Sequence, residues 1–341
     1  MADGGPTKKA KLASSSIAEL EARLEVEIRD VDAWQGLIKE LKSKRKSKEL
    51  VGVYERMVKV FPRSGQVWTE YIELVMANEG DDRIDSLFEA SLIKVPYVPL
   101  WELYLRYVKR VNAEKQDANT IATQAYEFAL SHIQSDIQSG PIWQEFIQFL
   151  EQLPAANQWE QQHKMDEIRR VYRKAVALPL SNIEALWRAY NSFENSISRT
   201  TARKFIDERS AGYMHARSVA RELNGLEKGV DKTTLPHLRQ FVPEDADVLK
   251  SWRKVLAYEK SNPLQVDADA MKNRVLYTYR QALVSMRYYP ELWLEFSDYC
   301  LETNEGSEAE EVLDQGLIAN PTSFFLTTKL ASIHETAGSM E

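Results

Sequence analysis

The chain has 341 residues, of which 44% are hydrophobic and 28% charged, and its 44 basic and 51 acidic side chains give a net charge of −7. This balance excludes a chain-wide basic surface for a phosphate backbone, and the single cysteine excludes a disulfide framework within the chain. No apolar run reaches the ~18 residues of a membrane-spanning helix, and the first residues lack the apolar core of a signal peptide, so we expect neither.

The N-terminal residues 1–15 are small and polar, which predicts a disordered, basic N-terminus. Lys8, Lys9 and Lys11 form a short cluster in it, which is either a nuclear-import signal or a solubilising tail. Ser16 and Glu19 then have the spacing of a capping box, which predicts a helix that runs to about Asp30.

Seven of the eight tryptophans recur along the chain, and each opens a similar segment. Six of them are followed by aromatic or apolar residues three and six positions later, and Trp34 opens a weaker copy. These offsets lie on one face of a helix, so each segment is predicted to be an amphipathic helix with an aromatic stripe. We expect this stripe to pack between neighbouring repeats through Trp34, Trp68, Tyr71, Trp101, Tyr104, Trp143, Phe146, Trp187, Tyr190, Trp252, Trp293 and Phe296.

A second predicted helix follows each tryptophan helix, and most of these second helices end at a proline, which cannot continue a helix. The prolines are Pro62, Pro96, Pro179, Pro290 and Pro321. The resulting unit of helix, turn and helix repeats about seven times, and a single hairpin cannot bury both of its faces. The sequence therefore predicts an all-α fold, an α-α superhelix or TPR-like solenoid of stacked helix-turn-helix repeats.

A cluster of basic residues lies at the turn between the first two repeat helices, starting at Lys39. One interpretation is a solvated charged loop, and the other is a contact with RNA or with an acidic partner. The candidate contact residues are Lys42, Lys44, Arg45, Lys46 and Lys48.

The repeat pattern is interrupted after Trp187, where a long helical stretch from Thr201 to Glu227 is followed by an irregular one. Residues 228–247 lose the helical pattern and contain Pro236 and Pro243. We therefore expect an N-terminal array over residues 16–227, a linker or loop over 228–247, and the start of a C-terminal array over 248–341, with a bend between the arrays.

Enzyme motifs are absent from the sequence: the histidines form no metal-binding pair, and no nucleophile elbow or phosphate-binding loop occurs. We interpret Asp267 and Asp269 as the polar start of a helix, and Cys300 as a buried apolar residue. Recurring glutamates on the tryptophan helices are expected to link neighbouring repeats rather than to catalyse: Glu70, Glu145, Glu194, Glu259 and Glu295. No catalytic, cofactor-binding or metal site, no cofactor and no enzymatic activity is predicted.

Beyond this periodicity, the helix pairs resemble the HAT repeat (half-a-TPR) of RNA-processing proteins. The segments ALWRAYNSFE at 185–194 and YEKSNPL at 258–264 are the most specific ones. Together with the rest of the stretch from Asp32 to Asn320, they resemble the large HAT-repeat subunit of the cleavage stimulation factor. That family is also called suppressor of forked and has a fungal counterpart in cleavage factor IA.

The resemblance implies a non-enzymatic scaffold of pre-mRNA 3′-end cleavage and polyadenylation, which binds other processing subunits and meets RNA mainly through them. It also implies that the protein is located in the nucleus, with the cytoplasm as a second possible compartment, and that it does not bind a membrane. In the family a C-terminal half dimerises, but this sequence stops soon after the repeat at Trp293, so we do not carry the homodimer over. The alternatives are a HAT scaffold of spliceosome or ribosome assembly and a direct RNA-binding module.

Overall fold

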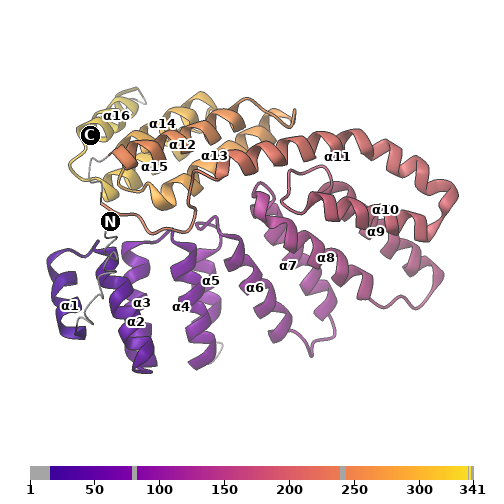
Figure 1. Cartoon of the computed structure of the whole chain (residues 1–341), viewed down its shortest axis with the longest axis horizontal. Coiled ribbons are helices and arrows are strands. Elements are labelled where there is room, and N and C mark those ends of the chain that lie inside the picture. The colour runs from indigo at the N-terminus through magenta and orange to yellow at the C-terminus, as the bar shows by residue number, and fades with distance from the viewer. Residues whose placement is uncertain (1–15, 79–82, 239–242, 337, 339–341) are drawn as a thin grey trace, which may run out of the picture.

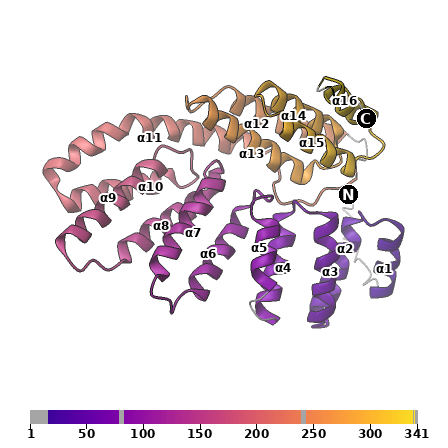
Figure 2. The same ribbon diagram turned by 180° about the vertical axis from the view of Figure 1, so that it is seen from behind.

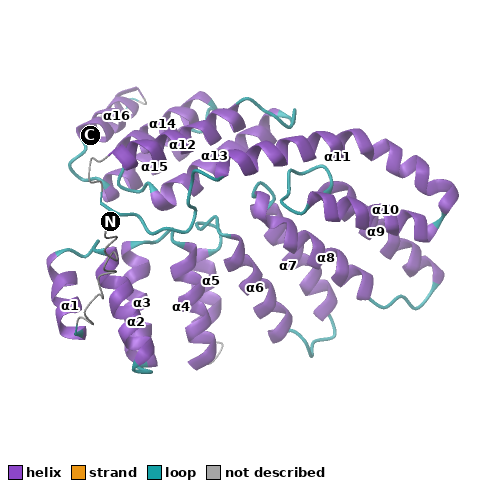
Figure 3. Cartoon of the chain, in the orientation of Figure 1, coloured by secondary structure: helices purple, strands orange, loops and turns teal. Residues whose placement is uncertain are grey.

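A computed structural model describes residues 16–78, 83–238, 243–336 and 338 of the chain. These residues form sixteen α-helices joined by turns, and no strand occurs among them (Figure 3). The predicted all-α fold is therefore confirmed. The predicted disordered N-terminus and its lysine cluster lie outside the described residues. Within those residues, no helix combines the length and the apolar character needed to traverse a bilayer.

The helices alternate in pairs, and the first helix of every pair carries one of the seven repeat tryptophans. These first helices are α2 (Val31–Ser43), α4 (Gly65–Asn78), α6 (Val98–Val111), α8 (Gly140–Gln152), α10 (Ile183–Ile197), α12 (Pro243–Lys260) and α14 (Pro290–Glu302). Their partners are α3 (Ser47–Val60), α5 (Ile84–Ser91), α7 (Ala118–Ile133), α9 (Gln158–Ala175), α11 (Arg199–Glu227), α13 (Ala268–Ser285) and α15 (Gly306–Ala319). The outer helices are α1 (Ile17–Val26) and α16 (Phe324–Thr336).

The capping box at the start of α1 is present as predicted: the backbone N–H of Glu19 donates to Ser16 Oγ at 3.2 Å, and that of Ser16 donates to Glu19 Oε2 at 2.8 Å. The helix ends at Val26, however, and does not reach Asp30. Asp30 instead caps α2, where its carboxylate accepts the N–H of Ala33 at 3.0 Å. Aspartate is among the best N-cap residues, which explains why the chain breaks there.

Two prolines open helices that the sequence pattern placed differently. Helix α13 ends at Ser285, so Pro290 does not terminate it but forms the first residue of α14. Helix α12 begins at Pro243, so the irregular segment is shorter than the predicted 228–247. Proline is well suited to the first position of a helix because the N–H that it lacks would have no helical partner. Glu244 and Asp245 in the first turn of α12 also favour this start through the helix dipole.

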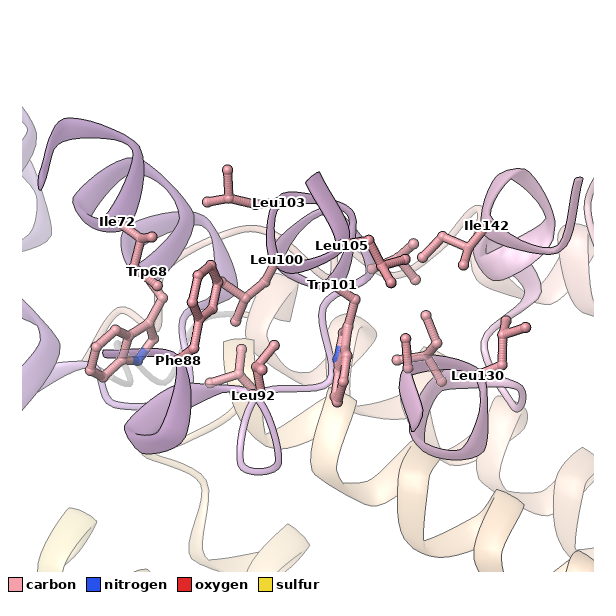
Figure 4. Packing of buried hydrophobic residues seen from close by; sticks show 14 of the residues in the cluster. Trp68, Ile72, Phe88, Leu92, Leu100, Trp101, Leu103, Leu105, Leu130 and Ile142 are labelled. Atoms are coloured by element: carbon pink, nitrogen blue, oxygen red, sulfur yellow. The ribbon is translucent and has the colours of Figure 1, made fainter. Parts of the chain in front are cut away.

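Buried apolar side chains form two clusters along the array. The first runs from Leu20 to Leu235, and the second runs from Leu249 to Leu326. Figure 4 shows Trp68 and Trp101 among the aliphatic and aromatic side chains of the first cluster. Within each cluster, packing between successive helix pairs holds the solenoid together.

The array folds back on itself. Helices α1–α8 form one curved row, the chain turns through α9 and α10, and the long helix α11 leads back so that α12–α16 lie opposite the earlier helices of that row (Figures 1 and 2). Contacts far apart in sequence join the two rows. Arg63 in the turn after α3 donates to Gln315 on α15, and Tyr277 on α13 donates to Asp136 in the turn after α7.

Candidate functional site

The aromatic residues singled out in the sequence lie mainly in the packing layers between helices. The buried ones are Trp34, Trp68, Tyr71, Trp101, Trp143, Phe146, Tyr190, Trp252, Trp293 and Phe296. Tyr104 and Trp187 are half-buried, and the Trp187 ring stacks on Tyr213 of α11 with centroids 4.3 Å apart. Since such rings are turned away from solvent, they are not available as platforms for a ligand.

Three of the repeat tryptophans also fix the turn that precedes their helix. In each case the indole Nε1 donates to the backbone carbonyl six residues earlier. The pairs are Trp34 with Ile28 (2.7 Å), Trp68 with Pro62 (2.9 Å) and Trp293 with Arg287 (2.8 Å). A part-buried backbone carbonyl needs a donor, and the indole supplies it. This hydrogen bond was not predicted from the sequence. The constant place of these three tryptophans, shortly after the turn that precedes their helix, could have indicated it.

The recurring glutamates link neighbouring helices. Glu70 on α4 accepts from Lys42 Nζ of α2 at 2.7 Å and from the hydroxyl of Tyr54 on α3 at 2.5 Å. Burial raises the pKa of Glu70, but the hydrogen bonds from Lys42, Tyr54 and Gln66 outweigh it and hold that pKa below its usual value. One carboxylate therefore joins three helices of two successive repeats.

The same arrangement recurs along the array. Glu145 on α8 accepts from Lys109 and from the hydroxyl of Tyr126, the latter at 2.8 Å. The remaining pairs are Glu194 with Arg169 (2.8 Å), Glu259 with Arg274 (2.7 Å) and Glu295 with Arg253. All five glutamates thus have a basic partner on another helix. Four of these pairs join successive repeats, as expected, whereas Glu259 pairs with Arg274 inside its own repeat of α12 and α13.

The basic segment near the start of the array is largely neutralised by its own neighbours. Lys42 bonds Glu70, Lys44 lies 3.3 Å from Glu40, and Lys46 lies 2.8 Å from Glu49. Lys42 and Lys48 are on helices α2 and α3 rather than in the predicted turn. Arg45, which has a positive φ of 55°, and Lys48 have no carboxylate partner among the described residues. The structure does not assemble these five side chains into one uncompensated patch.

A buried polar cluster joins the two rows of helices. Asp136 is 5% exposed and accepts from Tyr277 Oη at 3.0 Å and from Gln281 Nε2 at 2.6 Å. Lys232, in the segment after α11, lies 3.8 Å from Asp136 and 2.7 Å from Glu227. Burial, followed by the charge of Asp136, raises the pKa of Tyr277, so its hydroxyl keeps the proton that it donates. Nothing in the sequence periodicity predicts this cluster.

Reactive groups are not brought together in the described part of the chain. No group of three or more His, Cys, Asp or Glu side chains there is arranged to hold a metal ion. Cys300 is buried, and burial raises its pKa to about 12, so it stays a protonated thiol. Asp267 caps α13 by accepting the N–H of Ala270 at 2.8 Å, as expected for the polar start of a helix.

Comparison with solved structures supports the same fold. The crystal structure of CstF-77 superposes with a TM-score of 0.64 over 81% of this chain and 57% of that one, at 18% identity. At this level of identity the similarity concerns the fold.

Sequence comparison identifies closer relatives. The mRNA 3′-end-processing protein RNA14 of Yarrowia lipolytica is 38% identical over 96% of this chain, and that of Schizosaccharomyces pombe is 38% identical over 97%. The chain spans 41% and 45% of these two relatives. The family description "Suppressor of forked protein (Suf)" matches residues 15–341. The chain therefore belongs to the suppressor of forked family.

Proposed function

We propose that this chain is a non-enzymatic scaffold of the pre-mRNA 3′-end processing machinery and binds other processing subunits through the surface of its repeats. The observation that carries this proposal is the 38% identity to proteins named as mRNA 3′-end-processing proteins, which extends over almost the whole chain. The relatives are longer, so dimerisation and the other roles of a complete protein are not assigned to this stretch.

The architecture fits a scaffold. Solenoids expose long surfaces on which several proteins can bind side by side. In this array, the linked glutamates join neighbouring helices and the Asp136 cluster joins the two rows, so these surfaces are held in a defined relative position. A platform that is ordered before binding loses less conformational entropy when a partner docks.

Affinity purification from nuclear extract tests the proposal. The full chain is immobilised, and bound proteins are quantified by mass spectrometry against an unrelated helical-repeat protein of similar charge. We expect enrichment of cleavage and polyadenylation factors. Enrichment of spliceosomal or ribosome-assembly proteins instead would favour the alternative scaffolds, and absence of any cleavage factor would contradict the proposal.

The same proposal locates the chain in the nucleus. It also implies that the chain contacts RNA mainly through partner subunits. The net charge of −7 and the internal pairing of Lys42, Lys44 and Lys46 support this. A fluorescent fusion of the full chain tests the location: nuclear accumulation supports the assignment, and exclusion from the nucleus contradicts it.

A further inference from the structure

A cavity of about 560 Å³ lies where the two rows of helices meet. Its walls come from the end of α3 and the turn after it, from the segment after α5, and from α13, α14, α15 and the turn between α13 and α14. The two sides are far apart in sequence, since Arg63 on one side bonds Gln315 on the other, 252 residues later. The cavity therefore exists only because the array folds back.

The cavity carries an excess of positive charge in an acidic chain. Its basic side chains are Lys59, Arg63, Lys94, Arg280 and Arg287, and its acidic ones are Glu308 and Glu311, which leaves three positive charges uncompensated. Both carboxylates are already engaged, because Glu308 pairs with Arg280 and Glu311 accepts from Gln315 at 2.8 Å. Among the described residues, Lys59 and Lys94 have no carboxylate partner within ion-pair distance.

Arg63 is the central side chain of this cavity. Its Nη2 donates to Gln315, and its guanidinium lies 5.3 Å from the centre of the Trp293 ring. Its Nη1 is buried and has no hydrogen-bond partner within the described part of the chain. Burial, with the nearby charges of Arg280 and Arg287, lowers the pKa of Arg63 to about 10. A buried charged donor without an acceptor is strongly unfavourable unless an anion binds beside it.

The chemistry of the walls indicates the kind of anion. A single carboxylate would balance one of the three excess charges, whereas a pyrophosphate group balances all or nearly all of them. Guanidinium groups match phosphate oxygens with paired hydrogen bonds, and this cavity has three of them. Ile93 and Ile318, exposed by 66% and 75%, give the cavity aliphatic sides, and the aromatic lining residue, Phe296, is only 1% exposed, so its ring offers little stacking surface to RNA bases.

We infer that this cavity binds a compact polyphosphate anion, either free pyrophosphate or the diphosphate group of a nucleotide, through Arg63, Arg280 and Arg287. Such a ligand would bridge the two rows of helices and stabilise their folded-back arrangement. The inference does not depend on the proposed scaffold function.

Isothermal titration calorimetry of the full chain with sodium pyrophosphate at low salt tests this site. We expect one saturable site and a rise in melting temperature beyond that produced by sodium sulfate at equal ionic strength. Arg63→Gln and Arg287→Gln should each weaken binding at least about tenfold, because each removes a charged donor. The control Lys254→Gln, which removes an exposed charge from α12 outside the cavity, should leave the affinity unchanged.

The melting temperature without pyrophosphate separates lost binding from lost folding. Arg63→Gln relieves a buried charge but also removes the hydrogen bond to Gln315 and the contact with the Trp293 ring, so its affinity counts as lost binding only if its melting temperature stays close to that of the parent chain. If Arg63→Gln does not fold, the pyrophosphate affinities of Arg287→Gln and Lys59→Gln test the site instead. Titration with ADP distinguishes the two candidate ligands. Tighter binding of ADP than of pyrophosphate indicates the diphosphate group of a nucleotide, and weaker binding indicates free pyrophosphate. Absence of pyrophosphate binding, equal affinity in all variants, or binding only of an oligouridylate would overturn the inference.

Discussion

Tyr277 on α13 donates a 3.0 Å hydrogen bond to Asp136, which lies 141 residues earlier in the chain. Both side chains are buried, and Gln281 donates to the same carboxylate oxygen. A solenoid is normally held by contacts between neighbouring repeats. A bond between α13 and the turn after α7 therefore fixes the relative position of two distant repeats, which stacking of neighbours does not determine.

Removing this hydroxyl should weaken the junction between the rows. Tyr277→Phe is expected to lower the free energy of unfolding by about 1–3 kcal/mol, because Asp136 loses a buried donor. The control Tyr258→Phe removes an exposed 3.2 Å bond to Glu222 and should change stability by less than about 0.5 kcal/mol. Urea unfolding followed by circular dichroism measures both. An unchanged midpoint for Tyr277→Phe would show that the junction does not contribute to stability.

The tryptophan layers should be far more sensitive to truncation than the surface. Trp143→Ala is expected to cost about 3–5 kcal/mol, because it leaves a large cavity between helix pairs. Trp159 is 71% exposed, so Trp159→Ala provides a matched control with an expected change within about 0.5 kcal/mol. Thermal melts of the two variants compare them directly, and equal melting temperatures would refute the packing role of Trp143.

Glu70 predicts a pH-dependent contribution to stability. Its pKa in the folded chain lies below the usual 4.5, so its ionised form stabilises the fold above that pH, and the effect is lost as the pH falls through the folded-state pKa. Glu70→Gln should therefore be less stable than the parent chain at pH 7, with the difference shrinking below pH 4.5. Unfolding measured across this range, with the exposed Glu73→Gln as control, tests it. A difference that is constant with pH would exclude the ionised link.

Cys300 is expected to resist thiol reagents in the folded chain. Its side chain is fully buried and its pKa is raised to about 12, so almost no thiolate forms at pH 8. Ellman's reagent should react at once in guanidinium chloride and hardly at all in native buffer. Because the chain has one cysteine, the absorbance reports this site alone. Rapid labelling of the native protein would contradict the buried position.

Charge reversal of the basic turn should have little effect on RNA affinity. Lys44 and Lys46 already pair with Glu40 and Glu49, so a variant with Lys44, Arg45 and Lys46 changed to Glu removes few available charges. Filter binding of labelled RNA across a salt series measures this. If these residues contacted phosphates, the slope of log affinity against log salt would fall by roughly 2–3, one for each lost contact. That result would favour direct RNA binding.

The sequence predicts the features that repeat. Trp68, Trp101 and Trp293 recur with the same neighbours, so a pattern of period 3.6 is sufficient to place them on buried helix faces. The links made by Glu70 and Glu145 are predicted for the same reason, since both glutamates stand two residues after their tryptophan.

Features that occur once were not predictable. The meeting of Asp136 with Tyr277 and of Arg63 with Gln315 depends on the small rotation added at every repeat and on the course of the segment after α11. Neither of these two contacts produces a repeating pattern in the sequence. Charge pairing in the basic turn is a related case: composition shows the charges of Lys44 and Lys46, whereas only the three-dimensional arrangement shows that they pair with Glu40 and Glu49.

The indole bond to a carbonyl six residues upstream suggests where this chain tolerates change in length. The distance between consecutive repeat tryptophans varies from 33 to 65 residues, yet the interval from carbonyl to indole is the same in the three repeats where the bond forms. In these three repeats, any change in repeat length therefore falls outside the interval from carbonyl to indole. Anyone transplanting or exchanging repeats should cut ahead of that short interval, so that each tryptophan travels with the carbonyl it binds.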